Sequence, residues 1–312
     1  MSRAALNPSP KNSNYKYPPN TRVLLESYPV KGKDAVLVKL SSLFIVGSVL
    51  WGPFIAYPLI KKLWRKYNID KSAQKKMVCG AVLASLFIFI GPYRHRKVGK
   101  ALGVRNWDLW KSWLRFVAYE VIQDTTGDDV NGSDWSDMRD RQSILSIIPH
   151  GIFPFALGLA ALPEEAEHAF GSFRPIVATA TSLFPILRTI LSWLGAVDAS
   201  KRSVNKALKD GLSLGVAPGG IPEMFEGYPK PGTHPDDECA LLANRKGFIR
   251  MAIRHGIPVI PVYTFGATKM FKRLQLPWVF EYISKMLRVS ICLFFGQLGL
   301  PMPFRQRLLY GK

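Results

Sequence analysis

Two long apolar runs without a charged residue constrain this chain of 312 residues more than any other feature. They cover residues 40–60 and 77–93. A helix needs about 20 apolar residues to cross the hydrocarbon core of a bilayer, so the first run is long enough and the second is close to the lower limit. A pair of helices buried in a soluble core is the weaker interpretation, because soluble helices carry a polar face. We therefore predict a membrane-embedded helical hairpin within residues 35–100.

The flanks of both runs are basic. The chain has 42 Lys and Arg residues against 22 Asp and Glu, a net charge of +20. Such an excess needs an acidic partner, and nucleic acid, an anionic membrane or a phosphorylated ligand each fit. No nucleic-acid-binding motif is present and the charge crowds the apolar runs, so we expect a membrane rather than nucleic acid. Because both flanks are basic, the positive-inside rule leaves a two-span hairpin and a re-entrant hairpin open.

The rest of the chain divides into two parts. Residues 1–34 are rich in Pro, Asn, Ser and Lys and are predicted to form a mobile basic tail. Residues 101–312 are predicted to form one folded domain. Cys79, Cys239 and Cys292 are far apart, which argues against a disulfide framework and a zinc site, so no metal is expected.

Beyond residue 140 the pattern changes to alternating strands and helices. This alternation is typical of an α/β domain with a largely parallel sheet. Before it, residues 107–121 have the spacing of an amphipathic helix with an aromatic face, for which a core helix and an interfacial helix both stay open. The expected strands are residues 143–148, 176–181, 212–217 and 257–265, and the expected helices are residues 203–210 and 246–254.

Two short motifs follow predicted strands. PHG, with His150 and Gly151, comes after the first strand, and PGG, with Gly219 and Gly220, comes after the third and precedes Glu223. In open α/β sheets ligands bind beyond the carboxyl ends of the strands, so both motifs are expected at such an edge. Paired glycines expose backbone N–H groups to an anion, although a simple tight turn also explains PGG.

His150 is the strongest candidate for a general base. A histidine between two apolar segments needs a hydrogen bond or a chemical use, and its unperturbed pKa lies near neutrality. The alternative is a core histidine bonded to a backbone carbonyl. No GxSxG motif is present and no cysteine neighbours a candidate base in sequence. A base that activates a substrate hydroxyl is therefore favoured over a covalent nucleophile.

A basic helix face is the third candidate feature. Lys246, Arg250 and Arg254 are spaced by four, and Arg245 precedes them, so these cations share one face of the predicted helix. A solvated basic face and a clamp for a polyphosphate ligand both fit this spacing.

Several ordered motifs together make the chain resemble a known family. Between residues 148 and 309 they read PHGIFPFALG, FRPIVATATSLFPILR, LGVAPGGIPE, RKGF, AIRHGIPVIPVYTFG and FFGQLGLPMPF. In order and spacing they are similar to the type-2 acyl-CoA:diacylglycerol acyltransferases, which include the monoacylglycerol and wax-alcohol acyltransferases. The two apolar runs also resemble the N-terminal membrane hairpin of this family.

The resemblance implies a glycerolipid-acyltransferase-like α/β fold with a mixed, largely parallel sheet flanked by helices. It implies transfer of a fatty acyl group from acyl-CoA to the free hydroxyl of diacylglycerol, which makes triacylglycerol. Monoacylglycerol or a long-chain alcohol as acceptor stays open, as does a catalytically lapsed lipid-binding relative. No cofactor is implied beyond acyl-CoA as a substrate. The expected location is the endoplasmic reticulum membrane, with lipid droplets as a second site, and the oligomeric state stays open.

The resemblance also assigns roles to single residues. His150 takes the role of base, and Gly151, Gly219 and Gly220 are candidates for holding the oxyanion through backbone N–H groups. Glu223 is expected to orient the imidazole, and a turn-capping role is equally compatible. The residues expected to bind the CoA phosphates are Arg245, Lys246 and Arg250.

The chain departs from the family pattern at three places. Ile148 stands where the family commonly has the first histidine of His-Pro-His-Gly. After the last predicted strand the family usually has acidic and amide residues, and here Gly266 is followed by Ala267, Thr268 and Lys269. The chain is also expected to be short at its C-terminus, because family members generally continue for tens of residues. The last two departures bear on the substrate preference and on the substrate tunnel.

Overall fold

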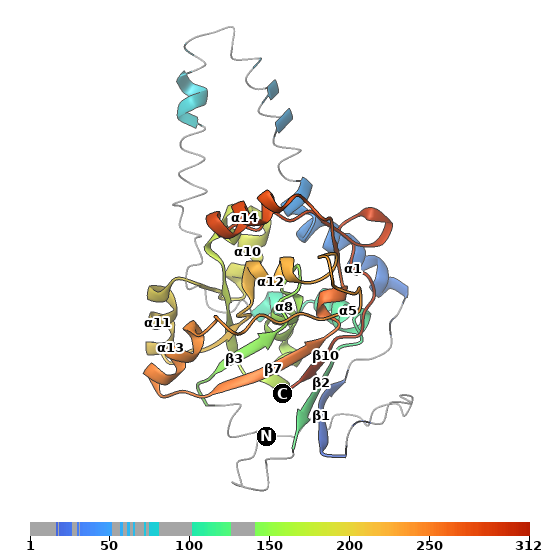
Figure 1. Ribbon diagram of the computed structural model, residues 1–312, viewed down its shortest axis with the longest axis vertical. Coiled ribbons are helices and arrows are strands. Elements are labelled where there is room, and N and C mark those ends of the chain that lie inside the picture. Colours follow the sequence, from blue (N-terminus) through green and yellow to red (C-terminus); the bar gives the residue numbers. More distant parts are fainter. Residues whose placement is uncertain are drawn as a thin grey trace.

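The protein is described by a computed structural model in which a mixed sheet lies at the centre (Figure 1). The structure describes residues 17, 19–26, 30, 32–51, 102–125 and 141–312, together with some positions between residues 57 and 80. In their order across the sheet, the strands are β1 (Thr21–Glu26), β2 (Glu120–Asp124), β10 (Leu309–Gly311), β7 (Val259–Phe265), β3 (Ile144–Ile148), β6 (Ser213–Val216), β4 (Phe173–Val177) and β5 (Val197–Asp198).

The sheet has a parallel half and a mixed half. β7, β3, β6, β4 and β5 run parallel to one another. β10 lies between β7 and β2, antiparallel to the first and parallel to the second, and β1 closes this side antiparallel to β2. The prediction of a mixed, largely parallel sheet is therefore confirmed.

Helices cover both faces of the sheet, as predicted. α11 (Lys201–Lys209) and α13 (Gly247–His255) pack on one face against Ile144 and Leu214. α5 (Asp108–Phe116) and α8 (Phe155–Ala161) cover the other face, where they meet Leu145 and Ile147. Two-residue strands β8 (Lys272–Arg273) and β9 (Phe294–Phe295) form a separate antiparallel pair. The helices are α1 (Gly32–Ile45), α4 (Leu102–Arg105), α5 (Asp108–Phe116), α8 (Phe155–Ala161), α9 (Glu167–Phe170), α10 (Pro185–Trp193), α11 (Lys201–Lys209), α12 (Gly220–Glu226), α13 (Gly247–His255) and α14 (Trp278–Leu287), with 3-10 turns η1 (Glu164–Ala166), η2 (Thr179–Leu183), η3 (Ala267–Lys269) and η4 (Gln297–Gly299).

One predicted strand is placed too late in the sequence. Residues 176–181 were expected to be extended, whereas β4 ends at Val177 and η2 begins at Thr179. Side chains in this stretch bond to the local backbone. The hydroxyls of Thr181 and Ser182 each donate to a carbonyl three residues earlier, at 2.7 Å, and such bonds favour a turn over a strand.

The amphipathic helix predicted over residues 107–121 forms as α5 and belongs to the core, but it ends at Phe116, and β2 begins at Glu120 within the predicted range. Trp110, Trp113 and Leu114 on its aromatic face are buried, while Trp107 just before it is exposed. The core interpretation therefore holds over the interfacial one.

The N-terminal segment differs from the predicted tail. Residues 21–26 form β1 and pair with β2 from Thr21 opposite Asp124 to Glu26 opposite Glu120, so this part of residues 1–34 is ordered in the sheet. A segment of six residues gives no local signal of a partner strand about 100 residues away. Residues 1–16 lie outside the described residues.

The first apolar run belongs to a helix that begins in α1. Gly32–Trp51 is a 20-residue helix long and apolar enough to cross a membrane by length and composition. One side of α1 packs on the domain, where Val38 is buried and Asp34 pairs with Arg115 at 2.8 Å. The predicted border at residue 35 thus falls inside α1. Most of the second run and residues 126–140 lie outside the described residues.

Candidate active site

The ends of three neighbouring parallel strands build the site. β3 ends at Ile148 and leads into PHG, while β6 ends at Val216 just before PGG. β7 lies on the other side of β3 and ends at Phe265. The two motifs meet as predicted, because the backbone N–H of His150 donates to Glu223 Oε1 at 3.1 Å.

The ring of His150 is held in one orientation. Its Nδ1 lies 2.7 Å from the carbonyl oxygen of Gly151, and a carbonyl only accepts, so Nδ1 carries the proton. This leaves a lone pair on Nε2. Burial lowers the pKa of His150 from 6.5, with the Gly151 carbonyl acting in the opposite direction. A neutral imidazole with a basic Nε2 is the form that a general base needs at neutral pH.

Glu223 holds the backbone of His150. The side chain sits in the first turn of α12 and is 4% exposed. We expected its carboxylate either to orient the imidazole or to cap the turn. The contacts fit turn capping: Oε1 accepts from the His150 main chain, while the ring turns toward Gly151. Among the described residues Oε2 has no hydrogen-bond partner. Burial raises the pKa of Glu223 to about 7, against the opposing effects of two backbone N–H groups and of Arg245.

The PGG motif makes room for this carboxylate. A Cβ atom added at Gly219 would lie 1.2 Å from Glu223 Oε2, so any larger residue there would displace the buried side chain. Gly220 has φ +58°, in the left-handed region that favours glycine, and it begins α12. The motif therefore fixes the position of Glu223 beneath the strand ends.

A cavity of about 420 Å³ opens beside these residues. Gly151 and Glu223 line it on the side of the strand ends, whereas the ring of His150 lies next to this lining rather than in it. The cavity combines an apolar part with cations and with the carboxylates of Asp236 and Asp237. Its further lining includes Ile152, Met224, Phe271, Cys239, Lys269, Lys272 and Arg305.

The cations at the cavity differ from the predicted set. Lys246 precedes α13, and it and Arg250 are exposed and do not line the cavity. Arg245 comes close enough to lower the pKa of Glu223. The prediction missed the three lining cations, although Lys269 and Lys272 lie within seven residues of the end of β7, the strand beside β3. Arg305 gave no local signal because it reaches the site from a distant segment.

A loop around Glu238 closes one side of the cavity, and sequence reasoning missed it as well. Glu238 Oε1 accepts from the backbone N–H of Gly266 at 2.7 Å and from the hydroxyl of Thr268 at 3.2 Å. The loop is thereby tied to the end of β7. Next to it, burial raises the pKa of Cys239, with Glu223 and Glu226 acting in the same direction. A thiol held neutral is a poor nucleophile.

In the described part of the chain, no three His, Cys, Asp or Glu side chains come together in a way that could hold a metal ion. The strand ends bring together a neutral imidazole, a buried carboxyl group and backbone N–H groups.

Comparisons with known proteins agree on one family. The family model described as diacylglycerol acyltransferase matches residues 77–308. Human diacylglycerol O-acyltransferase 2 is 26% identical over 62% of this chain and 49% of its own length. Human 2-acylglycerol O-acyltransferase 3 is 30% identical over 51% of this chain and 48% of its length. Human acyl-CoA wax alcohol acyltransferase 2 is 28% identical over 62% of this chain and 57% of its own length. The chain spans about half the length of these relatives.

Proposed function

The chain belongs to the diacylglycerol acyltransferase family, and we propose that it transfers a fatty acyl group from acyl-CoA to the free hydroxyl of diacylglycerol in a membrane. The observation that carries this proposal is the state of His150. Its Nδ1–H donates to the carbonyl oxygen of Gly151, which leaves Nε2 as a base. Burial lowers the pKa of the ring and keeps it neutral, beside a partly apolar cavity.

In the proposed reaction His150 acts as the general base. Nε2 accepts the proton of the acceptor hydroxyl as the hydroxyl oxygen attacks the thioester carbonyl carbon. The tetrahedral intermediate then collapses, the carbon–sulfur bond breaks, and the imidazolium returns the proton to the departing CoA thiolate. The products are the new ester and free CoA, and the base ends in its starting form.

Backbone N–H groups are proposed to hold the negative charge on the carbonyl oxygen. Gly151 is the best placed of the three predicted glycines because it both follows His150 and lines the cavity. Glu223 acts as a positioning residue: its hydrogen bond to the His150 main chain keeps the base at the strand end.

The CoA phosphates need cations at the mouth of the site. Arg245, Lys246 and Arg250 remain the predicted set, and the lining cations Lys269, Lys272 and Arg305 are a second set supported by their place at the cavity. Phosphates bind Lys and Arg through charge-assisted hydrogen bonds. An endoplasmic reticulum membrane location, with lipid droplets as a second site, is part of the same proposal. It is supported by the family and by the apolar helix Gly32–Trp51.

Three acceptor classes remain within the family, and the product identifies the acceptor. The test expresses the wild type and His150→Ala in cells that lack their own triacylglycerol synthesis, and separates the lipids by class. We expect triacylglycerol from the wild type and a fall of at least about 100-fold in the variant, because general-base catalysis contributes roughly that much. His168→Ala, a change at an exposed histidine, is the matched control and should keep full activity.

Other outcomes have defined meanings. A wax ester or diacylglycerol product would keep the mechanism and change the acceptor. Full turnover by His150→Ala would refute the base assignment. A membrane-resident wild type without any acyl-CoA-dependent product would favour the lapsed lipid-binding relative.

A further inference from the structure

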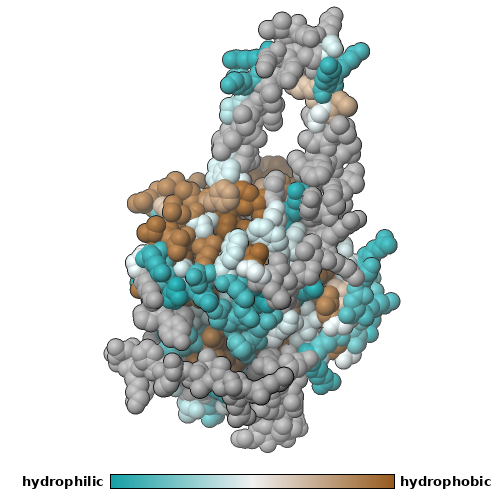
Figure 2. Space-filling model, turned by 180° about the vertical axis from the view of Figure 1, so that it is seen from behind, coloured by the Kyte–Doolittle hydropathy of each residue, from teal (hydrophilic) through white to brown (hydrophobic). Residues whose placement is uncertain are grey.

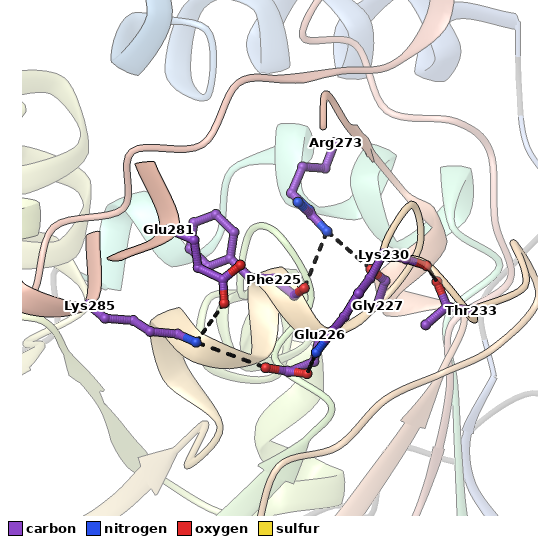
Figure 3. Close-up of polar contacts among 8 residues, drawn as sticks. All are labelled: Phe225, Glu226, Gly227, Lys230, Thr233, Arg273, Glu281 and Lys285. Atoms are coloured by element: carbon purple, nitrogen blue, oxygen red, sulfur yellow. Dashed lines mark hydrogen bonds and ion pairs between the residues drawn. The ribbon is translucent and has the colours of Figure 1, made fainter. Parts of the chain in front are cut away.

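Helix α14 presents its polar side to the protein. Ser284 is fully buried, and its hydroxyl donates to Phe280 O at 2.7 Å and accepts from the backbone N–H of Ile291 at 3.0 Å. Lys285 reaches Glu226 at the end of α12 at 4.0 Å and also pairs with Glu281 at 2.6 Å (Figure 3). The ionic contacts of α14 thus point inward, toward α12.

The opposite side of α14 is apolar and exposed. Trp278 is 78% exposed, and Tyr282 and Met286 follow it at spacings of four, with Leu287 beside them, all exposed as well. The rings of Trp278 and Tyr282 contact edge to face at 6.4 Å between centroids. A helix on a protein surrounded by water turns its apolar side inward. The pattern of α14 is therefore inverted, and its outer face is suited to an apolar medium.

Helix α1 repeats the inversion. Asp34 binds Arg115, Ser41 accepts from the indole N–H of Trp113 at 3.0 Å, and Ser42 donates to the carbonyl of Pro301 at 2.8 Å. These polar side chains all face the domain. The exposed large hydrophobic residues of α1 are Val36, Leu37, Leu40 and Phe44. Two helices far apart in sequence therefore share one arrangement, with polar contacts inward and apolar side chains outward.

Both helices lie at the same end of the molecule (Figure 1), where Figure 2 shows hydrophobic surface gathered on the face it presents. The turn η4 adds an exposed apolar side chain near α1. Its Leu298 is 89% exposed at a left-handed φ of +56°, and Pro301 just beyond it contacts α1 through Ser42. The apolar face of α14 thus lies at the same end of the molecule as the helix that is long enough to enter a membrane.

We propose that the outer face of α14 lies in the interfacial layer of the membrane that α1 enters, as a second attachment of the domain to lipid. Trp and Tyr side chains favour this layer, and an interfacial helix buries its apolar face about 5–10 Å into it. Arg288, the exposed residue directly after α14, matches the charge of anionic headgroups. The inference rests on the membrane attachment in the proposed function.

The attachment bears on the site because α14 packs on α12. α12 carries Glu223 and Met224, both of which line the cavity. Its C-terminal end is fixed by Arg273, whose guanidinium donates to Phe225 O at 3.3 Å and to Gly227 O at 3.2 Å (Figure 3). A lipid-facing helix thus forms the outer support of one cavity wall, which brings a lipid acceptor to the cavity from the membrane side.

The test measures where single positions of the full chain lie relative to lipid. The native cysteines are replaced by alanine, Met286→Cys or Ile253→Cys is introduced, and the thiol is labelled with an environment-sensitive fluorophore. Ile253 on α13 is 76% exposed and serves as the matched apolar control away from α14. The protein is reconstituted into vesicles of phosphatidylcholine and phosphatidylserine. Quenching is then compared between nitroxide-bearing lipids and aqueous iodide.

We expect the probe at position 286 to be quenched by the nitroxide lipids and protected from iodide, and the probe at position 253 to behave in the opposite way. Iodide quenching at 286 equal to that at 253, without nitroxide quenching, would overturn the proposal. Protection from both quenchers would mean that protein covers α14 and would overturn it too.

A third probe separates this inference from the membrane attachment itself. Leu40→Cys reports on the outer face of α1 in the same vesicles. Nitroxide quenching at 40 without quenching at 286 would refute the role of α14 and leave the membrane attachment intact. No quenching at either position would refute both.

Discussion

At the scale of single residues, the site depends on which atoms His150 and Glu223 offer to each other. The sequence identified His150 from its apolar flanks and from the strand that precedes it. It also placed Glu223 near His150, because their motifs follow neighbouring parallel strands. It did not predict that the carboxylate would bind the main chain, since that choice depends on the rotation of the imidazole toward Gly151, a torsion that no sequence pattern encodes.

Gly219→Ala tests the space that the PGG motif provides. The added methyl group would overlap Glu223 Oε2 and push the carboxylate away from the His150 N–H. We expect activity to be lost and the free energy of unfolding to fall by about 1–3 kcal/mol, the cost of leaving a buried group unpaired. Activity assays and thermal unfolding in detergent measure both effects. Gly158→Ala in α8, with open space at its Cβ, should keep activity, and equal behaviour of the two variants would contradict the packing argument.

The titration of Glu223 should appear in the stability of the protein. Its folded pKa of about 7 lies above the usual 4.5, so the folded state holds the proton more tightly. The stabilisation is complete below pH 4.5, declines as the pH rises, and is lost above about pH 7, on the order of 3 kcal/mol in total. Glu223→Gln has no carboxyl group to titrate and lacks this pH-dependent stabilisation, while His150 titrates in both proteins. The difference between their unfolding midpoints should therefore change across this window, and a constant difference would refute the raised pKa.

At the scale of secondary structure, local patterns predicted some elements well and others not at all. β3, β6 and β7 were found because short apolar runs end at proline or glycine. β1, β2 and β10 were missed because the segments that pair lie about 100 to 190 residues apart, and their pairing leaves no local signal. α1 was found as an apolar run, but the side it turns to the domain depends on Asp34, Ser41 and Ser42, whose partners lie in α5 and beyond η4.

Asp34→Ala tests how α1 is fixed to α5. Asp34 is fully buried and accepts from Arg115 Nε and from the hydroxyl of Ser112, each at 2.8 Å. Removing the carboxylate leaves a largely buried guanidinium unpaired, so we expect a loss of about 3 kcal/mol in the free energy of unfolding. Thermal unfolding in detergent measures it.

A neighbouring exposed pair provides the control for this prediction. Asp108 lies 3.9 Å from Lys111 with its side chain 93% exposed, and Asp108→Ala should change stability by less than about 0.5 kcal/mol. A shift no larger for Asp34→Ala than for this control would show that the buried pair does not anchor α1.

At the scale of the whole molecule, the fold decides which cations face the cavity. The net charge of +20 describes the whole chain, and charge alone could not tell which cations line the cavity. Lys246 and Arg250 were predicted to share a helix face, but Lys246 lies just before α13, and neither residue lines the cavity. The lining cations come from segments on two sides of α14, which only the folded chain brings together.

Lys272→Ala discriminates between the two sets of cations. If Lys272 contacts a phosphate of acyl-CoA, its loss should raise KM for acyl-CoA about 10-fold with little change in kcat, as expected for one charge-assisted hydrogen bond. Lys246→Ala is the matched control and should leave KM unchanged. Steady-state kinetics with a fixed acceptor decides between them. A raised KM for acyl-CoA in Lys246→Ala alone would assign binding of the CoA phosphates to the cations at α13.

The position of β10 between β2 and β7 has a consequence for biosynthesis. Residues 21–26 and 120–124 leave the ribosome long before residues 309–311, the strand that joins them to the parallel half of the sheet among the described residues. Until then the β1–β2 ribbon has an open edge. Nascent chains with such late, long-range pairing fold slowly and expose strands that aggregate. The order of synthesis therefore leaves this edge exposed until the last strand is made, and we expect a chaperone that covers it to raise the yield of folded protein.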